Sequence, residues 1–93
     1  MVIGILQIDL ILHDSQSLKD KRMVLKSLKA RLRNNFNVAV SELDYHEKWQ
    51  KALVGIASIG NEKRAIDAML ADIVNYISRE KAVEISDYST ELL

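Results

Sequence analysis

Basic side chains recur along one stretch of the chain at the spacing of a helix face. Between Ser17 and Phe36 there are seven basic residues and one acid, so this stretch carries +6 and the remaining residues sum to −6. Five of the cations are three or four positions apart: Lys19, Arg22, Lys26, Lys29 and Arg33. On a helix these five fall within roughly 80° of arc, and Lys21 lies close to the helix start. Such a stripe is typical of a surface that binds an anion or a nucleic acid.

The same charges also fit a solvated helix face or a surface that pairs with another subunit. No acid lies within the stripe, so the i,i+4 pairs that usually accompany a solvated face are absent. Lys19, Lys21 and Arg22 lie near the start of the predicted helix, where the helix dipole disfavours cations, and Asp20 offsets only part of this. A bound anion would offset the rest, as would acids from elsewhere in the fold or from a second subunit. Anion binding and subunit pairing therefore both remain open.

The aromatic residues Tyr45 and Trp49, with His46 between them, form the one aromatic cluster of the sequence. An exposed Trp or Tyr can anchor a protein partner or stack on a base. The alternative is that Trp49 folds back over the sheet edge as a core plug, which the usual burial of Trp favours. Tyr45 and Trp49 are thus candidate partner-binding residues.

The acids and histidines give only weak signals for catalysis or metal binding. Glu42, Asp44 and His46 would share one face of a strand, but three spaced ligands without another His in register are a poor metal signature. The run from His13 to Ser15 contains the letters of a hydrolase triad, yet adjacent residues cannot reach its geometry. With no cysteine, thiolate metal sites and a cysteine nucleophile are excluded. We predict a protein that is not an enzyme and uses neither a metal nor a cofactor.

The hydrophobic pattern predicts the elements that position these residues, beginning with a strand and a helix. Val2 to Leu12 alternates between a wholly apolar face and a mixed face, as in a strand packed on one side. Ser17 begins a helix, with Asp20 three positions later as in a capping box. The helix has an apolar stripe at helical spacing and ends in an Asn-rich turn at 34–37.

The second half of the chain predicts two further strands, a helix and a last strand. The strands are Val38 to Leu43 and Leu53 to Ile59, joined by residues 44–50. Gly60 and Asn61 mark a turn and a helix cap, and an amphipathic helix follows. Its apolar positions are Ile66, Met69, Leu70, Ile73 and Ile77. The last strand lies near Ala82 to Tyr88, with Leu92 as an alternative end.

The order βαββαβ predicts an α+β fold of the ferredoxin-like type, with two helices on one face of a four-stranded antiparallel sheet. Residues 1–93 then form one domain with one core, which should contain Ile8, Leu10, Leu28, Leu32, Ile56, Leu70 and Ile73. The first and third strands carry no aromatic residue, which argues against base stacking on the open sheet face. Ile3 and Ile5 on that face predict a surface covered by another copy, and hence a homo-oligomer.

The apolar start of the chain predicts a strand and not a targeting segment. Met1 to Leu12 has no basic residue ahead of the apolar run, and Gln7 and Asp9 interrupt it. No run approaches the roughly 18 apolar residues of a membrane helix. We expect a cytoplasmic protein without a membrane partner.

Several segments of the chain resemble the YlxP-like family of small bacterial proteins, a domain of unknown function. The likeness runs through Ser17-Leu18-Lys19-Asp20-Lys21-Arg22, Leu28 to Arg33, Phe36-Asn37-Val38, and Asp44 through Trp49-Gln50-Lys51-Ala52. The resemblance implies a ferredoxin-like fold and a bacterial cytoplasmic protein, and it brings no established catalytic residues. The family tends to be associated with translation and ribosome-maturation genes, which favours contact with RNA or the ribosome.

Two functional hypotheses follow from these observations. The leading one is a non-enzymatic RNA- or ribosome-associated protein that binds through Lys19, Lys21, Arg22, Lys26, Lys29 and Arg33. The rival is a protein-assembly module that forms a homo-oligomer or binds a protein partner through the open sheet face and has no nucleic-acid role.

Overall fold

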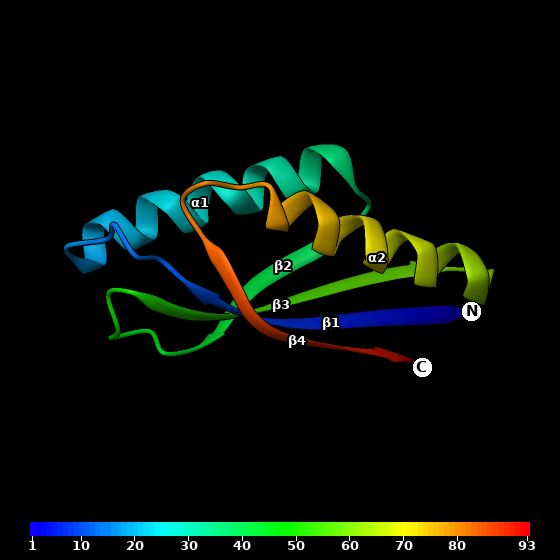
Figure 1. The fold of residues 1–93 in the computed structure, drawn as a ribbon. Coiled ribbons are helices and arrows are strands. Elements are labelled where there is room, and N and C mark those ends of the chain that lie inside the picture. The colour runs from blue at the N-terminus through cyan, green and yellow to red at the C-terminus, as the bar shows by residue number, and fades with distance from the viewer.

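Six elements follow one another in the predicted order in the computed structural model, which describes residues 1–93. They are β1 (Val2–Ile11), α1 (Leu18–Asn35), β2 (Ala39–Asp44), β3 (Lys51–Gly60), α2 (Lys63–Ser78) and β4 (Glu84–Leu92). The four strands are ordered β2-β3-β1-β4, and every neighbouring pair is antiparallel. Both helices lie on one face of the sheet and leave the other face open (Figure 1). The predicted ferredoxin-like α+β fold is confirmed.

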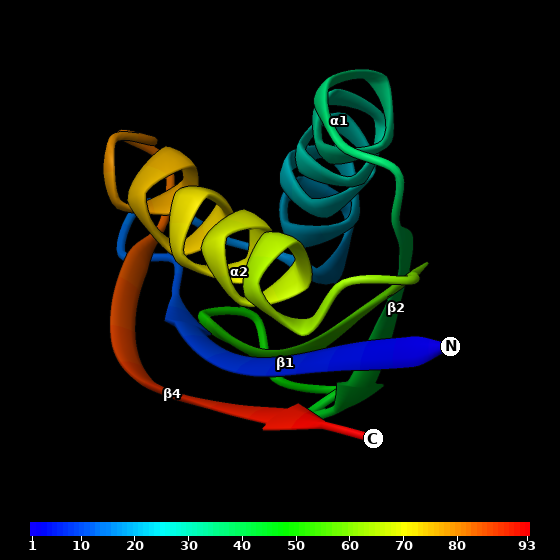
Figure 2. The same ribbon diagram turned by 90° about the vertical axis from the view of Figure 1, so that its right-hand side faces the viewer.

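The core lies between the helices and the sheet, because in both β1 and β3 every second side chain points toward the helices. Leu6, Ile8 and Leu10 of β1 are fully buried under the helices, whereas Gln7 between them is exposed on the open face. One cluster of 14 buried residues includes all seven of the predicted core positions. An end-on view places α1 on the β2 side of the sheet and α2 nearer β4, with these two strands at opposite edges (Figure 2).

Helix α1 begins at the predicted cap. Ser17 Oγ accepts a hydrogen bond from the Asp20 backbone N–H at 3.0 Å. Asp20 Oδ2 accepts in turn from the Gln16 backbone N–H at 3.0 Å, so the reciprocal bond of the capping box falls one residue earlier than usual. The prediction of Ser17 as the cap is therefore confirmed.

Helix α2 begins later than predicted. Its N-cap is Glu62, whose backbone is still extended and whose side chain accepts no capping bond. The cap predicted at Asn61 is wrong, because the chain stays extended for one residue more after β3. Close packing on β1 positions this helix, since a Cβ atom at Gly4 would overlap the Ile66 side chain.

Neither helix is long and apolar enough to cross a membrane.

Candidate nucleic-acid interface

Helix α1 presents its basic residues to solvent beside its buried face. Leu25, Leu28 and Leu32 are buried against the sheet. Four of the five regularly spaced cations are exposed and Lys29 is half-buried. We name this set the basic stripe: Lys19, Arg22, Lys26, Lys29 and Arg33. Over fourteen residue steps at about 1.5 Å each, it extends for roughly 21 Å along the helix.

The basic stripe faces away from α2. Arg31 marks the side of α1 that faces α2, because its guanidinium donates to the carboxylate of Glu80, which follows α2. This hydrogen bond raises the pKa of Arg31 above its ordinary value. At about 100° per residue, Lys29 and Arg33 lie roughly 200° around the helix from Arg31. The stripe therefore borders the outer edge of the molecule on the β2 side.

No residue of the basic stripe forms an ion pair. The structure contains three pairs with N···O distances of 4.0 Å or less: His13 with Glu84, Lys21 with Glu42, and Arg31 with Glu80. The intramolecular acids that could have neutralised the stripe are thus engaged elsewhere or out of reach. The positive charge of this flank is left for solvent, counterions or a partner.

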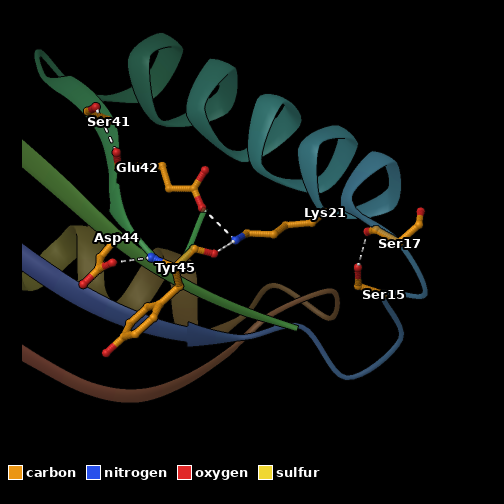
Figure 3. A network of polar contacts seen from close by, with 7 residues as sticks. All are labelled: Ser15, Ser17, Lys21, Ser41, Glu42, Asp44 and Tyr45. Atoms are coloured by element: carbon orange, nitrogen blue, oxygen red, sulfur yellow. Dashed lines mark hydrogen bonds and ion pairs between the residues drawn. The ribbon is translucent and has the colours of Figure 1, made fainter. Parts of the chain in front are cut away.

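Lys21 does not belong to this surface, although the sequence analysis included it among the nucleic-acid-binding residues. It is 1% exposed, and its Nζ lies 2.6 Å from the Tyr45 carbonyl oxygen and 2.7 Å from Glu42 Oε2. Figure 3 shows the side chain running from the first turns of α1 to the end of β2. Both contacts use its ammonium group, so Lys21 is unavailable to a phosphate. Its predicted role is wrong.

The burial of Lys21 follows from its helical phase. It lies four residues before Leu25, and Leu28 and Leu32 continue the same row, so Lys21 begins the apolar stripe. The spacing was visible in the sequence, but the partner was not. Glu42 Oε2 is buried and accepts no hydrogen bond of good geometry, so the Lys21 ammonium balances its charge as an ion pair.

The loop between β2 and β3 is held in a defined shape. Tyr45 adopts a left-handed φ of 63°, and its N–H donates to Asp44 Oδ1 at 2.7 Å. Its carbonyl oxygen accepts from Lys21 Nζ and from the Lys48 N–H at 2.9 Å. The Lys51 ammonium lies 4.2 Å from the centre of the Tyr45 ring, which points away from α1 (Figure 3).

Trp49 is exposed on this loop, with 55% of its surface accessible. The prediction that it plugs the core is therefore wrong. Gln50 closes the loop instead, because its side-chain amide donates to the carbonyl oxygens of His13 and Ser15 at 3.1 and 3.0 Å. These bonds leave the indole outside the core.

A hollow of about 720 Å³ lies beside Trp49, lined also by Ile11, Lys48, Lys51, Glu47, Gln50 and Ser86. Lys48 and Lys51 were not among the predicted site residues. A signal was present, because cations flank the aromatic residue in Lys48-Trp49-Gln50-Lys51.

The open sheet face carries an apolar patch that extends from the middle of the sheet, at Leu43, to the end opposite Trp49. We define the apolar patch as Ile3, Ile5, Ala39, Leu43, Ala57 and Ile59, residues that line two shallow hollows. Ile3 and Ile5 are half-buried, whereas Leu43 and Ile59 are 46% and 53% exposed. Leu43 lies over Gly55, where a Cβ atom would clash with it.

The four predicted partner-binding residues thus fall on two surfaces. Ile3 pairs with Ile59 at one end of the β1–β3 ladder, and Ile11 pairs with Lys51 at the other. Eight residue steps of about 3.3 Å separate these ends, or roughly 26 Å. Tyr45 and Trp49 lie at the Lys51 end, so the structure does not bring them together with Ile3 and Ile5.

The residues Glu42, Asp44 and His46 do not converge. The β2–β3 register shifts between Glu42 and Asp44, which breaks the alternation that would have placed them on one face. Glu42 turns toward α1 and pairs with Lys21. No group of three or more His, Asp or Glu side chains in the structure could hold a metal ion.

Comparison with known proteins identifies the family of this chain. Residues 3–90 match the family described as "Protein of unknown function (DUF503)". The chain is 33% identical over 90 residues to the "Uncharacterized protein YlxP" of Bacillus subtilis (strain 168), which covers 97% of this chain and 98% of that protein. The chain therefore belongs to the DUF503 family of proteins of unknown function, to which the resemblance to YlxP-like proteins had pointed.

Proposed function

We propose that this protein is a non-enzymatic RNA-binding protein of the bacterial cytoplasm that contacts RNA or the ribosome through the basic stripe of α1. The observation that carries the proposal is a row of five cations, none of them ion-paired, along roughly 21 Å of one helix. A row of this length can contact several phosphates of a nucleic-acid backbone, whereas a single small anion would occupy only part of it.

The electrostatics of the helix support a bound polyanion. Lys19 and Arg22 lie in the first turns of α1, where the helix dipole is positive and Asp20 is the sole acid. A phosphate near these residues would gain from the side chains and from the dipole together. The open sheet face offers no alternative platform of the RNA-recognition type, because β1 and β3 carry no aromatic residue.

The salt dependence of binding tests this proposal. We expect three to five phosphate contacts on a labelled single-stranded RNA of about twelve nucleotides, and hence a log-affinity against log-salt slope of about −2 to −3.5. Fluorescence anisotropy between about 50 and 200 mM salt would measure this slope. In Arg22→Gln/Lys26→Gln, which removes two exposed cations, the slope should become shallower by roughly 1.4 units.

A matched control removes the same charge elsewhere. Lys63 and Arg64 are exposed at the start of α2, and Lys63→Gln/Arg64→Gln should leave the slope of the parent protein unchanged. No binding by the parent at low salt would refute the proposed function. Equal effects of both double variants would refute the role of the basic stripe and indicate a response to net charge alone.

The apolar patch supports a second candidate function, an assembly module that pairs two copies of the chain. Its two exposed large side chains, Leu43 and Ile59, belong to a face that no helix covers. Exposed apolar side chains grouped on one face are typical of an interface. The patch and the basic stripe are separate surfaces, so a dimer could also bind RNA.

A further inference from the structure

Trp49 is an exposed aromatic residue on a loop that hydrogen bonds hold at three places. Lys21 holds the Tyr45 carbonyl oxygen from α1, Gln50 donates to the turn after β1, and the Leu12 N–H donates to the Gln50 carbonyl oxygen at 2.9 Å. Trp49 lies between these anchors with its side chain largely in solvent. A platform that is already ordered loses little conformational entropy when a ligand stacks on it.

Charged groups around the hollow suit a ligand that is aromatic and anionic. Lys48 and Lys51 line it together with a single acid, Glu47. Lys51 also lies over the Tyr45 ring, which keeps its ammonium group near the loop. A nucleobase beside a phosphate offers a flat face to the indole and a negative charge to the two lysines.

The loop also adjoins the basic stripe. Lys21 lies between Lys19 and Arg22 in sequence, and its side chain alone spans the distance from α1 to Tyr45. The α1 backbone at Lys19 and Arg22 is therefore about one lysine side chain away from the loop, while their own side chains leave the helix roughly 160° and 100° around from Lys21. A single strand with phosphates along α1 would pass around the β2–β3 loop to reach the hollow, which Ile11 lines from the open face of β1.

We infer that Trp49 stacks on an unpaired base of single-stranded RNA, while Lys48 and Lys51 neutralise the adjoining phosphates. This inference rests on the proposed function and narrows its ligand from RNA in general to RNA with at least one unpaired base. A perfect duplex keeps its bases stacked on each other, so it would leave the indole free.

The chain contains one Trp, so its fluorescence reports on this position alone. We expect single-stranded oligo(U) or oligo(A) RNA to quench the Trp49 emission with the midpoint that anisotropy gives for binding. Trp49→Ala should weaken single-strand binding about 5- to 100-fold, whereas Trp49→Phe should retain most of the affinity. Binding of an RNA duplex should be unchanged in both variants.

Tyr88→Ala is the matched control, because Tyr88 is a 51% exposed aromatic residue on β4, away from the loop. It should bind single-stranded RNA like the parent, and thermal unfolding would verify that each variant is folded. Salt-dependent binding without quenching, and with equal affinity of Trp49→Ala, would overturn the stacking inference and leave the basic stripe in place. Loss of all RNA binding in the parent would overturn both. Quenching by poly-glutamate but not by RNA would overturn the inference in favour of an acidic protein partner.

Discussion

Lys21 and Arg22 carry the same charge one position apart, yet they lie in opposite environments. A step of about 100° around the helix takes the chain from the centre of the buried row to the exposed flank. At Arg22 the charge stays in water, while at Lys21 it is desolvated and balanced by Glu42 and the Tyr45 carbonyl oxygen. The same positive charge is therefore part of the folded interior at one position and of the solvent-exposed basic stripe at the next.

Replacing Lys21 tests its structural role. In Lys21→Met the stem is kept, but Glu42 loses its counter-charge in a site where its side chain is only 19% exposed. We expect the free energy of unfolding to fall by about 3 kcal/mol. Urea unfolding measures this value, and Lys19→Met, on an exposed position, should change it by less than about 0.5 kcal/mol.

The double variant Lys21→Met/Glu42→Leu separates a lost ion pair from lost packing. Because it removes both charges, it should recover much of the lost stability. If Lys21→Met proved as stable as the parent, the buried pair would not contribute to folding as described.

At the scale of elements, α1 has two adjoining faces with different tasks. Its leucine row joins the single core cluster, and its basic stripe lies on the outer flank. The two faces contribute differently to the free energy of folding. Burial of the leucines holds the helix in place, whereas exposed charges contribute little to stability.

Truncating one leucine tests the packing of this helix. Leu28 is 2% exposed, so Leu28→Ala should lower the free energy of unfolding by about 2–5 kcal/mol through lost burial and a residual cavity. Met23→Ala removes a side chain of similar size from a 63% exposed position on α1 and should cost less than about 0.5 kcal/mol. Similar losses at both positions would contradict the assignment of the buried face.

At the scale of the whole molecule there are three surfaces: the basic stripe, the hollow beside Trp49 and the apolar patch. The β2–β3 loop lies between the stripe and the hollow, while the patch extends over the open face from Leu43 to Ile3 and Ile59. Acids lie along the β1–β4 side of the open face, where Asp9 pairs with Asp87 and Ile5 with Glu91. We expect a nucleic acid to avoid these acids and to approach the hollow from the β2–β3 loop.

Assembly through the apolar patch is a prediction about the whole molecule. Sedimentation at micromolar concentration should give a dimer for the parent, because a second copy would cover Ile5, Leu43 and Ile59. Ile59→Lys should shift the protein toward the monomer, since burying an unpaired charge is costly. Met23→Lys, at an exposed apolar position off the sheet, should sediment like the parent. A monomeric parent would refute this second candidate function.

The sequence by itself determined the type, order and faces of the elements. Alternation in β1 and the leucine spacing in α1 separate buried from exposed positions within a few residues, and the local cap at Ser17 marks a helix start. These patterns sufficed for the fold and for the exposure of Arg22, Lys26 and Arg33. The patterns mispredicted element boundaries, such as the N-cap of α2, because the side chain of Glu62 makes no capping hydrogen bond that a sequence motif could reveal.

Only the tertiary structure decided which polar residues meet. Lys21 donates to the carbonyl oxygen of Tyr45, which is 24 positions away in the sequence. Gln50 donates to the carbonyl oxygen of His13, which is 37 positions away. These contacts bury one lysine of the basic segment and keep the indole of Trp49 in solvent. A local pattern carries no information about partners so far along the chain, because folding alone brings them within hydrogen-bonding distance.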